Sequence, residues 1–471
     1  MFDNIRYMQY LSAFTATTGV MSGTIYMNWP SPILDDLISE NSPIGVTMTD
    51  EEASWMVSVL LLAALPAPPF VALLLWKIGR KRTLQISGLF LFFPWFLIIF
   101  ANDKWYLFLA RLIAGFGIPM ITASCSIYNG EIADTDIRGK LGTFINLMKI
   151  VGSLIVLSVG PFVSYTVISS ICAAIPIVFL STFSFMPESP YHLMKIGKPD
   201  DAKKALYRLA AKNVEESQIE KRMLEIETTL KKDEESVGFV EFLTKKQHRK
   251  IILLMLGLKM VQQMSGAAAI DSYMQDIIAS SESSLEPKYS SIIFGAVQIP
   301  ASILAFLIVD KLGRKPMLVI SAFGCAVALI SEGVYFYLQD YLHSEDIQSL
   351  GWLPVTALVL FLLMSNFGIL NLPFVLLGEM FADNVKGVAV SLASCLGAFF
   401  GFIVSKIFNP VKQAFGMYTI FWIYAGFCVA GGIFVLLALP ETKGKTFDEI
   451  QDQFNNIKIK KVEEKNGDEK V

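Results

Sequence analysis

Three charged segments recur in the same order in the two halves of the chain. They are KIGRKR (77–82) with DKLGRKP (310–316), GEIADTDIRG (130–139) with GEMFADNVKG (378–387), and PESP (187–190) with PETKGK (440–445). The copies lie 234, 248 and 253 positions apart (80 to 314, 131 to 379 and 188 to 441), which indicates a duplicated unit. Because glycine permits a tight corner and an arginine guanidinium can bind a carboxylate at two points, we predict ion pairs at helix ends. The candidate members are Arg80, Arg111, Glu131, Arg138, Glu188, Asp310, Arg314, Glu379, Lys386 and Glu441.

A second set of polar residues consists of amides inside long apolar runs. Amides offer hydrogen-bond donors and acceptors without net charge, so they suit a ligand rich in hydroxyl groups. An aromatic side chain among them can cover the apolar face of such a ligand. The alternative is that these amides bind neighbouring helices to one another. The candidate binding residues are Asn146, Gln262, Gln263, Gln298, Asn371, Phe374 and Lys259.

Four ionisable residues, Lys149, Lys259, Asp271 and Glu332, also lie within apolar runs. A charge at the centre of a bilayer costs roughly 2.5–3.5 kcal/mol on insertion scales, so each should face a cavity or a partner. Lys259 lies one turn before Gln262 and is expected to face the same cavity. Two alternatives stay open: Lys149 or Lys259 adapts the pocket to an acidic ligand, or they pair with a carboxylate or extend to the membrane interface.

The composition is typical of a membrane protein. Of 471 residues, 54% are hydrophobic and 17% are charged, whereas about a quarter of the residues of soluble proteins are charged. A net charge of −3 gives no electrostatic attraction for nucleic acid. The five cysteines have neither metal-ligand nor redox spacing, so we predict no metal site and no cofactor. No nucleophile or base stands at a useful spacing, which argues against an enzyme.

Twelve apolar runs follow one another in two groups of six. They lie near 8–28, 53–76, 83–101, 105–128, 140–162, 165–185, 251–273, 289–309, 316–338, 351–377, 387–407 and 415–439. The first connection, 30–52, contains no Lys or Arg, whereas the second, 77–82, holds four basic residues. By the positive-inside rule the first connection is outside and the second is cytoplasmic, so both termini are expected to be cytoplasmic.

These patterns predict an all-α membrane protein with twelve transmembrane helices in two six-helix pseudo-repeats, the architecture of the major facilitator fold. Helical spacing predicts short cytoplasmic helices at 200–211 and 215–232, between the two halves. The end of the polar tail is expected to be disordered. The expected units are an N-terminal half at 1–186, a linker at 187–250, a C-terminal half at 251–440 and a cytoplasmic tail at 441–471.

The ordered motifs resemble those of the sugar porter branch of the major facilitator superfamily, from about residue 14 to about residue 450. They are RLIAGFG (111–117), the segment 131–139, PESPY (187–191), QQMSGAA (262–268) and PETKGK (440–445). The fragments MNWPSP (27–32) and ESPYHL (188–193) are similar to the insect facilitated trehalose transporter group.

The chain departs from the family pattern at several positions of the expected substrate site. The resemblance implies an Asn, a Pro-Trp pair, an Asn-Trp pair and a Gln at these positions. This chain has instead Ala268, Pro373 with Phe374, Gly397 with Ala398, and Asn146. Each loss removes a hydrogen bond or a stacking surface worth on the order of 0.5–1.5 kcal/mol. A hexose site of the usual kind is therefore not expected.

The resemblance implies a monomeric plasma-membrane carrier that equilibrates a small sugar, trehalose or glucose-like, by alternating access. Proton-coupled relatives usually carry an Asp in the first span beside the Arg of the fourth, here Arg111. The first span of this chain, 8–28, has no carboxylate, so facilitation is expected. The alternatives are a sugar sensor that does not transport, a proton-coupled carrier that uses Asp271 or Glu332, and a carrier of acidic substrates.

The ion pairs at the helix ends are expected to gate this cycle. They would hold the halves together at the cytoplasmic side while the outside is open, and would break when the inside opens. The family pattern has an Arg after PESP where this chain has Tyr191, so the network is expected to be weaker by one pair. The alternative is that these charges only anchor the topology.

Overall fold

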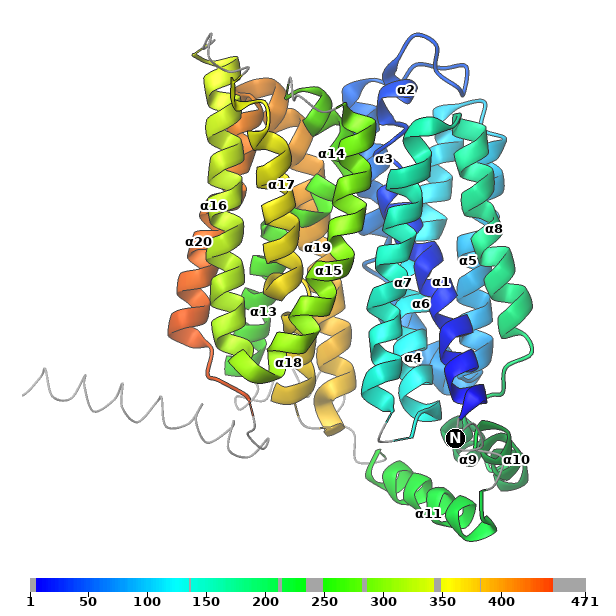
Figure 1. The fold of residues 1–471 in the computed structure, drawn as a ribbon. Helices are drawn as coiled ribbons and strands as arrows, with labels where there is room; N and C mark the ends of the chain where they lie inside the picture. Colours follow the sequence, from blue (N-terminus) through cyan, green and yellow to red (C-terminus); the bar gives the residue numbers. More distant parts are fainter. Residues whose placement is uncertain are drawn as a thin grey trace, which may run out of the picture.

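All regular elements in the described part of the chain are helices. The computed structural model describes residues 6–134, 137–210, 214–233, 249–281, 286–342, 349–381 and 383–443. The helices form two bundles that stand side by side, with three further helices at one end of the N-terminal bundle (Figure 1). We call the end with these three helices the linker end, and the opposite end, where α2 lies, the α2 end.

The N-terminal bundle follows the apolar runs of the sequence. Its helices are α1 (Tyr7–Asn28), α2 (Leu34–Ile38), α3 (Asp50–Ala63), α4 (Ala67–Lys77), α5 (Arg80–Ile99), α6 (Lys104–Ile132), α7 (Arg138–Val159), the 3-10 turn η1 (Gly160–Phe162) and α8 (Tyr165–Phe183). One predicted run, 53–76, is divided between α3 and α4 just before Pro66 and Ala67. A proline has no N–H to donate to the preceding turn, which explains the break.

The C-terminal bundle contains two broken helices. Its elements are α13 (Arg249–Met264), α14 (Ala267–Ala279), α15 (Pro287–Leu312), α16 (Arg314–Asp340), α17 (Leu353–Met364), the π-turn η3 (Ser365–Ile369), α18 (Leu372–Met380), α19 (Asp383–Phe415) and α20 (Met417–Ala438). Gly266, between α13 and α14, has a φ of 85°. A Cβ there would lie 2.2 Å from the Tyr424 ring, so both the turn and the packing require glycine.

Three short helices follow α8 at the linker end. They are α9 (Pro190–Lys195), α10 (Pro199–Leu209) and α11 (Glu216–Asp233). Helices α10 and α11 agree with the two helices expected at 200–211 and 215–232. The sequence did not predict α9, which begins at Pro190 with the Ser189 hydroxyl accepting the backbone N–H of His192 at 3.4 Å.

Ten helical stretches in the described ranges are long and apolar enough to cross a membrane. The two remaining predicted runs, 8–28 and 289–309, are occupied by α1 and α15, which stand in the bundle with the others (Figure 1). Helix α1 is rich in Ser and Thr, which lowers its mean hydropathy. The four threonine hydroxyls bind carbonyls of the preceding turn, as Thr15 does with Leu11 at 2.9 Å, so their burial needs no water.

The two bundles contact one another mainly through α3 with α19 and α7 with α15. Near the α2 end, Ser54 Oγ donates to the Lys406 carbonyl at 3.2 Å, and the Gln413 amide donates to the Asp50 carboxylate at 2.9 Å. The Lys406 ammonium also lies 4.3 Å from the centroid of the Trp55 ring. These contacts join the two halves at the α2 end.

Candidate functional site

The first charged cluster joins the start of α5 to the end of α6 and the start of α9. Arg80 Nη2 lies 2.6 Å and Nε lies 3.0 Å from Oε1 of Glu131. The Ser189 hydroxyl donates to the other oxygen of Glu131. Oε1 of Glu188 accepts the backbone N–H groups of Arg80 at 3.1 Å and Lys81 at 2.9 Å, so it caps α5. We call Arg80, Glu131, Glu188 and Ser189 the N-terminal cluster.

The second charged cluster repeats this arrangement in the other bundle. Arg314 Nη2 and Nε each lie 3.0 Å from Oε1 of Glu379. The Thr442 hydroxyl donates to the other oxygen of Glu379 at 2.6 Å. The Glu441 carboxylate accepts the backbone N–H groups of Arg314 at 3.0 Å and Lys315 at 3.1 Å. We call Arg314, Glu379, Glu441 and Thr442 the C-terminal cluster.

A glycine before each arginine makes this capping possible. Gly79 and Gly313 both have a φ of 92°, and a Cβ at either position would lie 2.8 Å from an oxygen of the capping glutamate. Burial by itself would raise the pKa of Glu441. The backbone N–H groups that bind it, first among them that of Lys443, lower the pKa below its usual value. The carboxylate is therefore held ionised against the helix N-terminus.

The described contacts divide the predicted network between the two halves. Arg80 pairs with Glu131 inside the N-terminal bundle, and Arg314 pairs with Glu379 inside the C-terminal bundle. Arg138 is exposed. The side chains of Asp310 and Lys386 lie outside the described residues. An ion pair that crosses between the halves at the linker end therefore stays a prediction.

Two members of these clusters, Ser189 and Thr442, and one neighbouring residue, His192, were not expected from the sequence. Ser189 and Thr442 follow the glutamate in both PES and PET, so the repeat itself was the signal that could have found them. His192 is 4% exposed, with Nδ1 at 3.3 Å from Arg80 Nη1. Burial, and then the charge of Arg80, lower the pKa of His192 to about 4, so the imidazole is neutral near pH 7.

Arg111 lies apart from both clusters. It is 1% exposed, and its guanidinium donates to the carbonyls of Tyr26, of Met56 at 3.0 Å and of Val57 at 3.1 Å. It thus ties α6 to the end of α1 and to α3. Among the described residues no carboxylate pairs with Arg111, so its place in the predicted ion-pair network is corrected to a link between helices.

Buried polar residues gather where α13 meets the broken helix of η3 and α18. Lys259 is 1% exposed, and its ammonium donates to Oε1 of Gln262 at 2.8 Å. The same ammonium lies 3.4 Å from the centroid of the Phe374 ring, a cation–π contact. The Gln262 amide donates in turn to the Leu370 carbonyl at 2.6 Å, which lies at the break between η3 and α18. Three of the predicted binding residues are therefore in contact.

The Gln263 side chain faces α19. A Cβ at Gly397 would lie 3.5 Å from its Nε2, and a Cβ at Gly401 would lie 3.4 Å from its Oε1. Gly397, one of the departures from the family pattern, thus puts no side chain against this amide. Across the space between the bundles, Lys149 of α7 is close enough to Lys259 for electrostatic interaction. Among the described residues neither lysine forms an ion pair, so the expected carboxylate partner is not found there.

The remaining predicted binding residues are less clearly part of one site. Asn371 donates to the Asn366 carbonyl at 2.8 Å, which satisfies a local turn. Gln298 is 9% exposed within α15, and Asn146 is exposed on α7. Glu332 is 1% exposed, and neither of its carboxylate oxygens has a hydrogen-bond partner among the described residues. No group of three His, Cys, Asp or Glu residues in the same ranges could hold a metal ion.

Comparisons with known proteins agree with this architecture. A family model described as sugar (and other) transporter matches residues 11–454. The facilitated trehalose transporter Tret1 of Bombyx mori is 31% identical over 447 residues, which cover 94% of this chain and 86% of that protein. Tret1 of Polypedilum vanderplanki is 29% identical over 450 residues, covering 94% of this chain and 88% of that protein.

Solved structures of one bacterial transporter share the fold. The xylose transporter XylE from E. coli, in a partially occluded inward open conformation, gives a TM-score of 0.79 at 20% identity and covers 93% of this chain and 100% of that chain. The proton:xylose symporter XylE bound to 6-bromo-6-deoxy-D-glucose gives a TM-score of 0.75 at 20% identity, covering 95% of this chain and 99% of that chain.

Proposed function

The chain belongs to the sugar transporter family, and we propose that it moves a neutral sugar, trehalose or a glucose-like sugar, across the plasma membrane by facilitated alternating access. As a member of this family it is a multi-pass membrane transporter and not an enzyme. Its similarity to the Tret1 proteins supports trehalose as the first substrate to test.

The observation that carries the proposed site is the amide of Gln263. The side chain is half-buried, and among the described residues no hydrogen-bond partner reaches it. It lies beside Gly397 and Gly401, which put no side chain against it, on the same helix as the buried Gln262. Neighbouring residues hold this amide in position but form no hydrogen bonds with it in the described part of the chain. Its donors and acceptor are therefore suited to bind sugar hydroxyls.

The test is uptake of labelled trehalose and labelled glucose into liposomes that contain the purified protein. Gln263→Ala should weaken the apparent affinity roughly 2- to 10-fold, the range expected for one lost hydrogen bond. Gln339→Ala is the matched control, because this amide donates to the Ser280 carbonyl at 2.7 Å, near the α2 end. Equal effects of the two variants would remove Gln263 from the site, and saturable binding without saturable flux would favour a sensor.

Arg111 supports facilitation rather than proton coupling. Three backbone carbonyls occupy its guanidinium, and α1 contributes no carboxylate beside it. Flux should therefore equilibrate the sugar without accumulation when a pH gradient is imposed. Accumulation driven by that gradient would favour a symporter, and Glu332→Gln would then be the first variant to examine.

A second candidate substrate class is an acidic sugar or a related organic anion. Lys149 and Lys259 lie near one another from opposite bundles, without a carboxylate partner in the described ranges. Two unneutralised ammonium groups in a low-dielectric site would favour an anion. Stronger competition by glucuronate than by glucose, lost in Lys259→Gln, would support this class, and equal competition would support a neutral sugar.

We further propose that the linker end faces the cytoplasm and that this conformation is open toward that side. The four basic residues of 77–82 lie at this end, as the positive-inside rule requires. The contacts between Ser54 and Lys406 and between Gln413 and Asp50 close the α2 end. A cysteine-reactive, membrane-impermeant reagent should label a cysteine placed at Lys204 only from the cytoplasmic side, and labelling from outside would reverse the orientation.

A further inference from the structure

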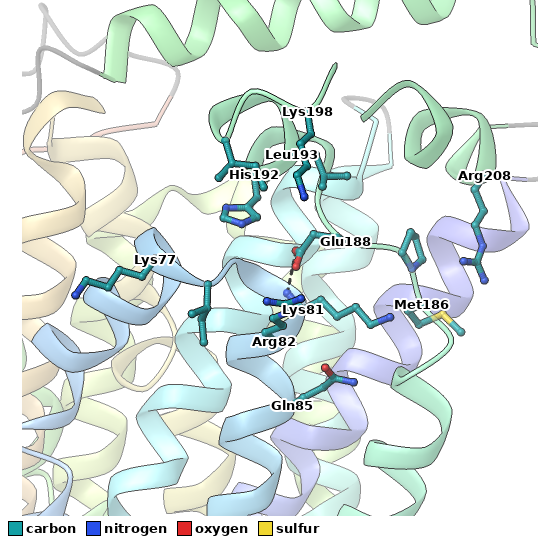
Figure 2. Close-up of a pocket in the computed structure, with 13 residues that line it drawn as sticks. Lys77, Lys81, Arg82, Gln85, Met186, Glu188, His192, Leu193, Lys198 and Arg208 are labelled. Carbon is teal, nitrogen blue, oxygen red and sulfur yellow. Dashed lines mark hydrogen bonds between the residues drawn. The ribbon is translucent and has the colours of Figure 1, made fainter. Parts of the chain in front are cut away.

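A cavity of about 590 Å³ lies at the linker end of the N-terminal bundle, outside the proposed sugar site. The end of α4, the start of α5, the segment after α8, and helices α9 and α10 enclose it (Figure 2). Part of its lining belongs to 187–250, which the sequence predicts only as a linker with short helices. Its side chains nevertheless have a distinct chemistry.

The cavity is lined by five cationic side chains and one carboxylate. The carboxylate is that of Glu188, whose Oε1 already accepts backbone N–H groups at the start of α5 (Figure 2). Its single negative charge acts on Lys81 but offsets only part of the positive charge of the five cations around it. The five cationic residues are Lys77, Lys81, Arg82, Lys198 and Arg208.

Two of these cations are held in place by the segment that follows α8. Lys81 Nζ donates to the Ser184 carbonyl at 2.7 Å, and Arg208 Nη2 donates to the Phe185 carbonyl at 2.6 Å. Glu188 attracts the Lys81 ammonium, whereas Arg208, the second cation held by this segment, repels it. Ordered like charges are a feature of anion sites, because a bound anion removes the repulsion.

Two more cations have no anionic partner. Among the described residues Arg82 and Lys198 form no ion pair, although both line the cavity. Lys198 extends from the segment before α10 toward the interior of the cavity (Figure 2). The neighbouring His192 reports the same positive surroundings, because burial first and then Arg80, Lys195 and Arg82 lower its pKa to about 4.

The rim of the cavity includes apolar side chains. Met186 and Ile196, which is 45% exposed, line the cavity, and Phe185, which precedes Met186 in the chain, is 72% exposed. Because α5 and α8 are among the membrane-crossing stretches, their ends at this level belong to the interfacial zone of the bilayer. A ligand there can place a charged group in the cavity and apolar chains along the bundle.

We propose that this cavity binds a phosphate-bearing anion, and that its apolar rim selects the headgroup of an anionic phospholipid at the linker end. Arg208 and Arg82 can bind phosphate oxygens through their guanidinium forks, while Lys81 and Lys198 add point charges. The bound headgroup would connect α5 to α10 and so fix the linker helices against the N-terminal bundle.

Topology anchoring alone does not explain these charges. The C-terminal bundle repeats the Gly-Arg-Lys corner, yet Pro316 stands at the position equivalent to Arg82. Lys198 and Arg208 come from the linker, which has no counterpart after α20 in the described ranges. The basic residues of the cavity thus exceed what the duplicated corner provides.

The test measures the thermal stability of the purified full-length protein in detergent with two probes. One is dioctanoyl phosphatidic acid, and the other is glycerol 3-phosphate, which carries the same phosphate without acyl chains. The double variant Lys198→Glu with Arg208→Glu should weaken the stabilisation by the lipid at least about tenfold in midpoint concentration. Lys204→Glu is the matched control, since this side chain is on the same helix but pairs with Asp201, outside the cavity.

Each outcome either identifies the source of the bound phosphate group or overturns the proposal. Stabilisation by the lipid alone would support a phospholipid headgroup, and equal stabilisation by both probes would support a soluble phosphate compound. No difference between the double variant and Lys204→Glu would overturn the proposal, because only diffuse surface charge would then be involved. Phosphatidylcholine with the same chains must fail to compete, since a zwitterionic lipid that binds equally would also overturn it.

Discussion

The N-terminal and C-terminal clusters have the same internal construction but different surroundings. In both, an arginine at the start of one membrane-crossing stretch binds a glutamate at the end of the next, and a second glutamate caps the helix that the arginine begins. The N-terminal cluster is additionally covered by α9 and by the buried His192, whereas the tail beyond residue 443 lies outside the described residues. The ion pair and the helix cap therefore belong to the duplicated fold. The differences between the clusters come from the segments that follow each half.

The two glycines test whether the covering segment makes the first corner less tolerant. Gly79→Ala places a Cβ 2.5 Å from the His192 ring and 2.8 Å from Glu188, whereas the three atoms nearest to the Cβ of Gly313→Ala all belong to the Glu441 carboxylate, the nearest at 2.8 Å. Both variants suffer the strain of a positive φ, about 1–2 kcal/mol, and overpacking adds about 1–3 kcal/mol. We expect Gly79→Ala to lower the unfolding temperature more.

Unfolding in detergent, followed by tryptophan fluorescence, measures this difference. Gly197→Ala is a suitable control, because its φ is 72° but nothing lies within 4 Å of the added Cβ. A larger loss in Gly313→Ala than in Gly79→Ala would show that the covering helix yields more readily than the corner of the second half.

Replacing the arginine of each cluster compares the two clusters again, with a smaller expected effect on stability. Arg80→Ala leaves Glu131, whose side chain is 15% exposed, without its cation, whereas Arg314→Ala leaves Glu379, which is 27% exposed. Stranding a partly buried carboxylate costs about 1–3 kcal/mol, and the more exposed group should lie at the low end. We expect a greater loss of thermal stability in Arg80→Ala. Equal losses would mean that the extra burial of the first cluster has no energetic consequence.

Between pH 7 and pH 5, His192 should give the first cluster a pH dependence that the second cluster lacks, because the pKa of Glu441 lies below this window. The pKa of His192 is lowered to about 4 in the folded protein against 6.5 when unfolded, so between these values the unfolded state binds more protons. Stability is thus full above pH 6.5 and falls as the pH drops toward 4. The loss between pH 7 and pH 5 should be on the order of 1–2 kcal/mol.

This dependence is measured as the unfolding temperature across that pH range. His192→Gln should flatten the profile, because glutamine keeps an acceptor near Arg80 without titrating. The control is Thr442→Val, which removes the hydroxyl that binds Glu379 in the C-terminal cluster. This variant should leave the slope of the profile unchanged. An unaltered slope in His192→Gln would assign the dependence to other groups.

The sequence predicted much of this fold because membrane helices require long apolar runs. The runs agree with the helices, and the repeated motifs identified Arg80, Glu131, Arg314 and Glu379, which form two equivalent ion pairs. The breaks in the C-terminal bundle were not predicted, since Gly266 and Asn371 each lie inside one predicted apolar run, 251–273 and 351–377. Hydropathy cannot distinguish a continuous helix from one that a glycine or proline interrupts.

The ligand sites were harder to predict because their chemistry depends on which side chains satisfy one another. Asn371 was expected to bind substrate, yet its amide is used by the Asn366 carbonyl. Lys259 was expected to face the cavity, and it is buried against Gln262 and Phe374. The basic cavity beside α10 joins residues more than a hundred positions apart, such as Lys81 and Arg208, so the linear pattern of charges resembled an ordinary solvated linker.

The smallest expected effect concerns gating, and it compares the two clusters directly. Glu131→Gln or Glu379→Gln removes a carboxylate charge from a pair that is partly exposed, so each change should shift conformational populations by about 0–1 kcal/mol. Each described pair lies within one half, so gating requires that Glu131 and Glu379 also act across the halves when the linker end is closed. In that case both variants should increase labelling of cysteines at that end and decrease labelling at the α2 end. The N-terminal variant should have the smaller effect, because His192 remains beside Arg80. Labelling of single cysteines at each face, with the native cysteines replaced, measures this shift. Unchanged labelling from both faces would leave these charges as anchors of topology, and their duplication would then reflect the helix corners alone.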